Sequence, residues 1–208
     1  GGKPVTAIGD SAFYKKGLTG VVIPETVTTI GKASFLDNSL TVLTVPSGVT
    51  VIGEAAFMNN PLTQVILQEG LVSIGDRAFF RNDIASLNLP GSLRSIGISA
   101  FESNELTELD IPDGVETIGG SAFTDNMIAR LTLPDSLTSL GGLAFSNNLL
   151  TALPEGWTSL GESASAFSRN RLTHVVIPED LPSLGRQALD GNLLVSVTVP
   201  ESVTSIGR

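Results

Sequence analysis

Six acidic residues near the middle of this 208-residue chain are the side chains best placed to do chemistry, because no basic residue interrupts them. Glu108 and Asp110 stand two residues apart in a segment of alternating apolar residues, so both carboxylates should face the same side of a strand. Carboxylates about 5–10 Å apart across a substrate can hydrolyse a glycoside, and they can also bind a cation. Arg130 follows Glu108 by 22 residues, and a solvated ion pair between the two is the simpler interpretation. The six acids are Glu102, Glu105, Glu108, Asp110, Asp113 and Glu116.

The sequence contains few residues that could support other kinds of catalysis. His174 is the only histidine and the chain has no cysteine, so a metal site or a catalytic triad lacks its usual members. The missing cysteine also excludes a disulfide scaffold, a zinc finger, an iron–sulfur cluster and a thiol nucleophile. No EF-hand or glycine-rich nonapeptide calcium motif occurs. We therefore expect no enzyme activity, no cofactor and no metal site, although the sequence leaves cation binding around Glu108 and Asp110 open.

The overall charge narrows the class of partner. The net charge is −9, and the 12 basic residues are scattered along the chain. This argues against nucleic acid or an anionic membrane surface as a partner. No apolar run approaches the roughly 18 residues that span a bilayer, so no membrane insertion is expected.

The elements that must position these residues come from a repeat of 22 residues. Ile-Gly or Leu-Gly recurs ten times, and the step is 22 except for one step of 20 and one of 24. Phenylalanine falls every 22 residues from Phe13 to Phe167, with Leu189 in the next place, and only Phe80 lies outside this register. One unit reads I-G-x-x-A-F-x-x-N-x-L-T-x-L-x-[IVL]-P-x-x-[VL]-x-x. Such a period is the signature of a solenoid.

Each part of the unit predicts a local structure. L-T-x-L-x-[IVL] alternates like a half-buried strand, and proline ends it because proline cannot donate to a sheet ladder. The stretch ending in V-T-x-I-G predicts a second extended run on another side of the coil, where glycine supplies a turn or a backbone conformation unfavourable to larger residues. The x-x-A-F-x-x-N stretch has room for only one 3₁₀ or α turn. Stacked at about 4.8 Å, about nine coils then form a single domain over residues 1–208.

Two columns of the repeat should line the inside of the stack. We expect the phenylalanines to form the core, and the asparagines three residues after them to bond the backbone of their own and adjacent coils. Trp157 falls in a Val/Leu column beside the shortened copy, where it either fills space or stacks on a ligand. The asparagines are Asn38, Asn60, Asn82, Asn104, Asn126, Asn148, Asn170 and Asn192.

The fixed phase of Ala-Phe, Leu/Ile-Pro and Ile-Gly from about Val5 to Arg208 resembles the BspA-like, or treponemal-class, leucine-rich repeats. The resemblance implies a mainly β leucine-rich repeat solenoid with short 3₁₀ or α turns. It also implies a right-handed superhelix with a parallel sheet on the concave face. The chain departs from the family by carrying Asn38 and its equivalents where cysteine is frequent. Members are typically bacterial or protist surface and secreted proteins implicated in adhesion, which implies a secreted or cell-surface location in a bacterium.

On the concave face, the side chains between the core positions of each strand should point outward. These positions vary in charge and size while the core columns repeat nearly unchanged. A recognition surface has this pattern, and so does a solvated face on which nothing is selected. The candidate ligand-binding residues are Gln64, Ser86, Asn88, Glu108, Asp110, Arg130, Thr132, His174 and Val176.

These observations predict a non-enzymatic extracellular recognition or adhesion module that binds a protein or glycan ligand. A structural spacer or stalk in a surface protein is the alternative, and an enzyme is the third. The chain begins and ends within its own repeat without a convincing polar cap, although solenoids need capped ends. We therefore expect a fragment of a longer protein.

Overall fold

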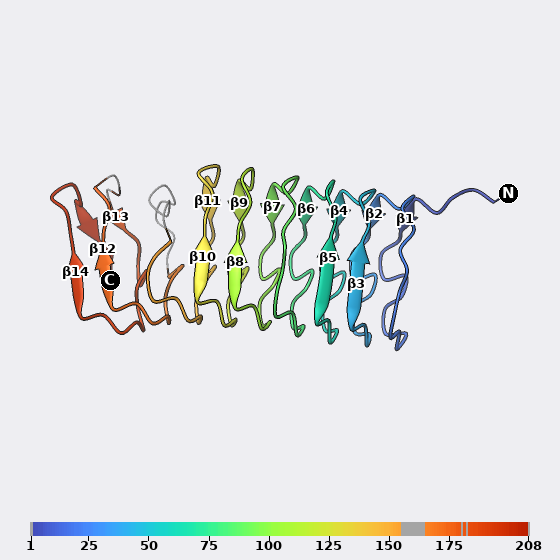
Figure 1. Cartoon of the computed structure of the whole chain (residues 1–208), viewed down its shortest axis with the longest axis horizontal. Coiled ribbons are helices and arrows are strands. Elements are labelled where there is room, and N and C mark those ends of the chain that lie inside the picture. Colours follow the sequence, from blue (N-terminus) through green and yellow to red (C-terminus); the bar gives the residue numbers. More distant parts are fainter. Residues whose placement is uncertain (1, 155–164, 180, 182, 208) are drawn as a thin grey trace.

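The computed structural model describes residues 2–154, 165–179, 181 and 183–207. These residues form a parallel β-solenoid of about eight turns, close to the predicted nine, and no helix is present among them. The coils follow one another along a single axis, so that the first and last coils lie at opposite ends of an elongated stack (Figure 1). Trp157 lies outside the described residues, and both of its predicted roles stay predictions.

The V-T-x-I runs form a continuous seven-stranded parallel sheet along one side of the stack, in the order β1-β2-β4-β6-β7-β9-β11. Successive strands pair in register with a step of 22 residues, as in Thr29↔Val51. Farther along the chain, β13 (Ser183–Leu184) pairs with β15 (Ser205–Ile206) in the same way. The seven strands are β1 (Ala7–Ile8), β2 (Thr29–Ile30), β4 (Val51–Ile52), β6 (Ser73–Ile74), β7 (Ser95–Ile96), β9 (Thr117–Ile118) and β11 (Ser139–Leu140).

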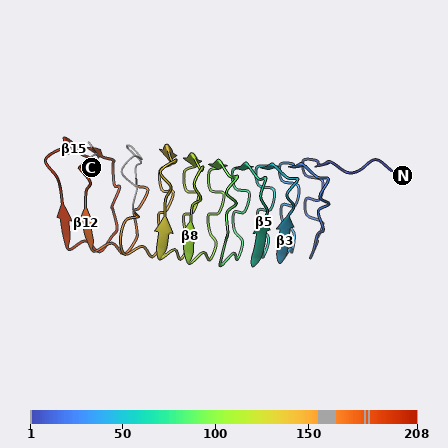
Figure 2. The ribbon, with the colours of Figure 1, turned by 45° about the horizontal axis from the view of Figure 1, so that its top comes forward.

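The L-T-x-L segments form the longer strands, which lie along another side of the stack (Figures 1 and 2). Within the described residues they make three separate two-stranded parallel sheets, β3–β5, β8–β10 and β12–β14. The predicted parallel sheet of this side is therefore present as pairs of strands. Their bounds are β3 (Val42–Val45), β5 (Gln64–Leu67), β8 (Glu108–Asp110), β10 (Arg130–Thr132), β12 (His174–Val176) and β14 (Ser196–Thr198).

A column of glycines explains why the first sheet runs without a break. A Cβ atom on Gly53 would lie 2.7 Å from the carbonyl carbon of Gly31 in the preceding coil. The equivalent atom on Gly141 would lie 2.2 Å from the amide nitrogen of Gly120. Glycine is required here by the close approach of two backbones, and not by the unusual backbone conformation that we considered from the sequence. The L-T-x-L side has no such column.

The A-F-x-x-N stretch forms two successive turns closed by i→i+3 hydrogen bonds, where the sequence predicted a single 3₁₀ or α turn. In one coil the Ala56 amide donates to the Gly53 carbonyl and the Met58 amide donates to the Ala55 carbonyl, both at 3.2 Å. Ala55 and Asn59 both have a φ of 53°. Because these left-handed residues interrupt the turns, no helix develops.

The phenylalanine column forms the predicted core ladder. Neighbouring rings stack with centroids 5.1–5.8 Å apart from Phe13 to Phe167. The rings from Phe35 to Phe145 are fully buried, whereas Phe13 in the first coil is 40% exposed. Each ring is therefore covered by the coils on both of its faces, and the core is continuous along the stack.

The asparagine column confirms the second predicted ladder. The side-chain amide of Asn60 donates to the carbonyl of Phe57 in its own coil at 3.1 Å and to that of Phe35 in the preceding coil at 3.0 Å. Its side-chain oxygen accepts a hydrogen bond from the Leu40 amide at 3.1 Å. Each asparagine thereby joins two coils. The same bonds to the Phe position of both coils recur at Asn38, Asn104, Asn126, Asn148, Asn170 and Asn192.

Candidate ligand-binding face

The nine candidate residues are all exposed on the L-T-x-L side of the stack. We call this surface the strand face. In β8 and β10 the middle residue is buried and its two neighbours are exposed, because successive side chains of a strand point to opposite sides. The strand face consists of Gln64, Ser86, Asn88, Glu108, Asp110, Arg130, Thr132, His174 and Val176.

The in-register pairing of β8 and β10 brings four of these residues together. Arg130 Nη2 lies 3.4 Å from Glu108 Oε2, which confirms the predicted ion pair. The Thr132 hydroxyl donates to Asp110 Oδ1 at 2.8 Å. Both acids of the candidate pair therefore contact the coil that follows them. Glu108 is thus paired with a base, whereas Asp110 accepts a hydrogen bond from a neutral hydroxyl.

His174 and Val176 lie in a different part of the strand face. They are on β12, which pairs with Ser196 and Thr198 of β14. The histidine ring Nδ1 is 3.0 Å from the hydroxyl of its neighbour Thr173. The structure does not bring this histidine into the acid group of β8 and β10.

A shallow hollow of about 220 Å³ opens in the strand face beside β8. Four candidate residues, Ser86, Asn88, Glu108 and Asp110, lie in its lining. Leu87, Leu89 and Pro112 complete the lining with apolar surface. Sequence reasoning identified the four polar residues but missed the hollow. One available signal was size, since Ser86 and Asn88 are shorter than Gln64 and Ile66 at the same positions one coil earlier.

The hollow lies where the sheet of the strand face is interrupted. Segment 86–89 is aligned with β5 and β8 by the repeat, yet it is not a strand and pairs with neither. Among the described residues, its backbone amides and carbonyls make no backbone hydrogen bond, and the nearest one joins the Thr107 amide to the Ala85 carbonyl at 3.4 Å. Unpaired backbone polar groups are rare away from water. The backbone amides and carbonyls of this segment are therefore left to interact with water and not with a neighbouring strand.

The loop that follows this segment is tied to the preceding coil by Glu69. Its carboxylate accepts hydrogen bonds from the amides of Gly91 at 3.0 Å and Ser92 at 3.1 Å. These bonds, chiefly the one from Gly91, hold the pKa of Glu69 below its ordinary value. Glu69 therefore holds the loop that follows Pro90 against the preceding coil.

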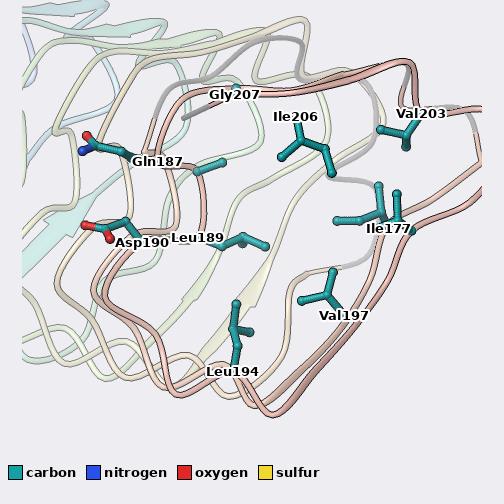
Figure 3. A pocket seen from close by; sticks show the side chains of 12 residues that line it. Ile177, Gln187, Leu189, Asp190, Leu194, Val197, Val203, Ile206 and Gly207 are labelled. Carbon is teal, nitrogen blue, oxygen red and sulfur yellow. The ribbon is translucent and has the colours of Figure 1, made fainter.

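A larger hollow of about 460 Å³ lies at the last coil (Figure 3). Leu194, Val197, Val203 and Ile206 point into it, whereas Asp190 points away. These apolar side chains occupy the columns that form the core in earlier coils. We therefore assign this hollow to the stacking surface of the repeat and keep the strand face as the candidate site.

Two further features hold for the described residues alone. No three His, Asp or Glu side chains in this part of the chain come together in a way that could hold a metal ion. None of its segments is a helix long and apolar enough to cross a membrane.

Comparison with protein families gives one match that spans nearly the whole sequence. The model of the BspA type leucine-rich repeat region, which holds six copies, matches residues 6–128 and residues 95–208. The matched repeat includes both ladders and the whole strand face. No curated protein matches the sequence.

Solved structures of bacterial leucine-rich repeat proteins share the fold. YopM from Yersinia enterocolitica WA-314 superimposes with a TM-score of 0.62 at 25% identity, over 89% of this chain and 38% of YopM. A leucine-rich repeat protein from Eubacterium ventriosum gives a TM-score of 0.52 at 20% identity, over 87% of this chain and 47% of its own. One from Bacteroides ovatus gives 0.50 at 19% identity, over 98% and 67%. The chain thus spans less than half the length of the first two.

Proposed function

Because this chain belongs to the BspA-type leucine-rich repeat family, we propose that it is a non-enzymatic recognition module that binds a protein or glycan through the strand face. The observation that carries the proposal is the contrast between a fixed interior and a varied exterior. The Phe and Asn ladders repeat from coil to coil, whereas the strand face changes in charge, size and pairing. The hollow beside β8 lies on this varied face.

The same reasoning supports a location at the surface of a bacterium or outside it. Leucine-rich repeat folds generally mediate protein interactions, and the structures similar to this chain come from bacteria. An adhesion role is consistent with a long, exposed face. For a longer protein that contains this chain, we propose the same binding role.

The test is a charge-neutralising variant of the strand face that carries Glu108→Gln, Asp110→Asn, Arg130→Gln and His174→Ala. We expect it to lose binding to a panel of purified matrix proteins and immobilised glycans, measured by biolayer interferometry. Its melting temperature should stay nearly unchanged, because exposed substitutions of this kind usually change stability by less than about 0.5 kcal/mol. If every interaction of the wild type survives in the variant, the strand face is not the binding surface.

The matched control removes the same number of charges elsewhere. Asp113→Asn, Glu116→Gln and Arg77→Gln also remove two acids and one base, all exposed and all outside the strand face. We expect this variant to bind like the wild type. Equal losses in the two variants would point to a general charge effect rather than to a site.

A spacer or stalk is the second candidate function, and the unbroken Phe ladder favours it. A spacer should tolerate the strand-face substitutions but respond to deletion of one whole unit, such as residues 53–74. To distinguish the two functions, a ligand-binding reporter domain is fused to the end of the stack and the fusion is displayed on cells. The quantity measured is the capture of the soluble reporter ligand by these cells. Dependence on coil number, with no effect of the strand-face variant on any partner, would favour the spacer.

A further inference from the structure

The hollow beside β8 combines an apolar floor with an acceptor rim. Leu87 is only 8% exposed, and Leu89 and Pro112 are half-buried, so the floor is hydrocarbon. Glu108 and Asp110 supply carboxylates, and Ser86 and Asn88 supply neutral oxygens. None of the seven residues that line it is basic or aromatic.

This combination fits a side chain with a hydrocarbon stem and a cationic end. Lysine buries its methylene stem along apolar surface while its ammonium group stays among polar acceptors. The ammonium group has three donors and no acceptor, so it suits a rim of carboxylate, amide and hydroxyl oxygens.

The state of the two carboxylates favours lysine over arginine. A guanidinium group is held best by both oxygens of one carboxylate in a planar, two-bond arrangement. Glu108 Oε2 already contacts Arg130, and Asp110 Oδ1 already accepts the Thr132 hydroxyl. Each carboxylate therefore has one oxygen committed to the following coil, which leaves single acceptors for a compact ammonium ion.

The surrounding charge steers such a group toward the hollow. The lining of the hollow carries two acids and no base, and Arg130 of the following coil pairs with only one of them, Glu108. An acidic surface raises the local concentration of cationic groups and their rate of association. A glycan is less well matched, since none of the lining residues offers an aromatic ring against which a sugar could stack.

We propose that the hollow beside β8 binds a lysine side chain presented by a protein partner. This inference rests on the proposed function and deepens it by naming the group that the strand face recognises. It commits the partner to a protein whose contact surface carries an exposed lysine.

The experiment titrates isotope-labelled protein with the peptide acetyl-Gly-Ser-Lys-Ser-Gly-amide and follows backbone amide shifts by NMR. We expect saturable shifts centred on residues 86–89 and 108–110, with a Kd on the order of 1 mM, which is typical of a single weak contact. The same peptide with an acetylated lysine should bind at least fivefold more weakly, because acetylation removes the charge.

Two double variants then separate the hollow from the general charge of its coil. Glu108→Gln with Asp110→Asn should weaken lysine-peptide binding at least fivefold. Asp113→Asn with Glu116→Gln removes two charges from the same coil outside the hollow and should change it less than twofold. Unchanged shifts of residues 30–80 in each variant establish that the stack is folded.

The proposal is overturned if the lysine peptide causes no saturable shifts at the hollow. It is also overturned if the two double variants weaken binding equally, or if the acetylated peptide binds as tightly. Calcium chloride or a soluble glycan that shifts the same residues at lower concentration would replace lysine as the occupant. Partner binding that depends on the strand face while the lysine peptide fails would refute this inference alone, leaving the proposed function intact.

Discussion

Replacing Asn104 by alanine tests the ladder that holds the coils together. Its amide donates to the carbonyls of Phe79 at 2.9 Å and Phe101 at 3.1 Å, and its oxygen accepts the Ile84 amide at 3.2 Å. Within the described structure, the Phe79 carbonyl has no other donor, whereas the Phe101 carbonyl keeps a bond from Asn126 at 2.9 Å. The substitution therefore leaves two buried groups, the Phe79 carbonyl and the Ile84 amide, without partners.

The magnitude follows from those two groups. An unsatisfied buried donor or acceptor costs about 1–3 kcal/mol, so we expect Asn104→Ala, which leaves two such groups, to lower the free energy of unfolding by about 2–6 kcal/mol. The assay is urea unfolding followed by circular dichroism at equilibrium. The m-value, which is the slope of the free energy of unfolding against urea concentration, should be the same in the variant and the wild type. This control is needed because a repeat protein can lose cooperativity when one coil is weakened.

Asn126→Ala provides a matched control one coil later. Asn104 and Asn126 are both 7% exposed and donate to the same kinds of carbonyl. Asn126, however, shares the Phe101 carbonyl with Asn104 and the Phe123 carbonyl with Asn148. Its removal therefore leaves only the Leu106 amide without a hydrogen-bond acceptor. We expect Asn126→Ala to be the milder change by about 1–3 kcal/mol. Equal losses, or a loss below about 1 kcal/mol at Asn104, would refute this account of the ladder.

Three further predictions use the same unfolding measurement or an NMR titration. Phe101→Ala should lower the free energy of unfolding by about 3–5 kcal/mol, because it leaves a cavity between two stacked rings. Phe101→Leu should lower it less, since Leu189 occupies this column naturally. A small effect of the alanine variant on stability would contradict the buried ladder. Ser34→Ala should raise stability by about 1 kcal/mol, because the Ser34 hydroxyl is buried without a partner and its desolvation is uncompensated; a loss of stability would show that the hydroxyl is bonded. The pKa of Glu69 is lowered in the folded state. The stability that the ionised Glu69 carboxylate contributes should therefore be fully present above its ordinary pKa of 4.5 and should be lost as the pH falls through the lower folded-state pKa. Glu69→Gln should abolish this dependence of stability on acid pH.

The regular part of the fold could be predicted because each of its contacts repeats at the period of the sequence. Phe101 stacks on Phe123 and Asn126 bonds the preceding coil for the same reason, namely that each ladder joins neighbouring coils at one constant separation, 22 residues from ring to ring and 25 from the Asn amide to the Phe carbonyl. The ion pair of Glu108 with Arg130 follows from that register too. A period in the sequence is therefore sufficient to identify the core and the direction of the exposed side chains.

The interruption of the strand face could not be predicted, because it depends on small differences between similar coils. Segment 86–89 has the alternation of its neighbours, yet it does not pair with them. Pairing on this side lacks the close glycine contact that Gly53 and its equivalents provide on the other, so each coil pairs or not according to its local packing. The hollow, and with it the grouping of Ser86 and Asn88 with the acids, arises from that failure.

The two sheets give the stack a mechanical asymmetry. Along one side, hydrogen bonds link seven consecutive coils without a break, so that side resists extension as a bonded spine. Along the strand face, bonded pairs of strands alternate with segments such as 86–89 that pair with no strand, so this side carries fewer hydrogen bonds between coils. A bending load would therefore open the strand face before the bonded spine, and the width of the hollow beside segment 86–89 would change with the curvature of the stack. If the strand face binds a partner as proposed, bending of the stack would therefore change the shape of the binding site.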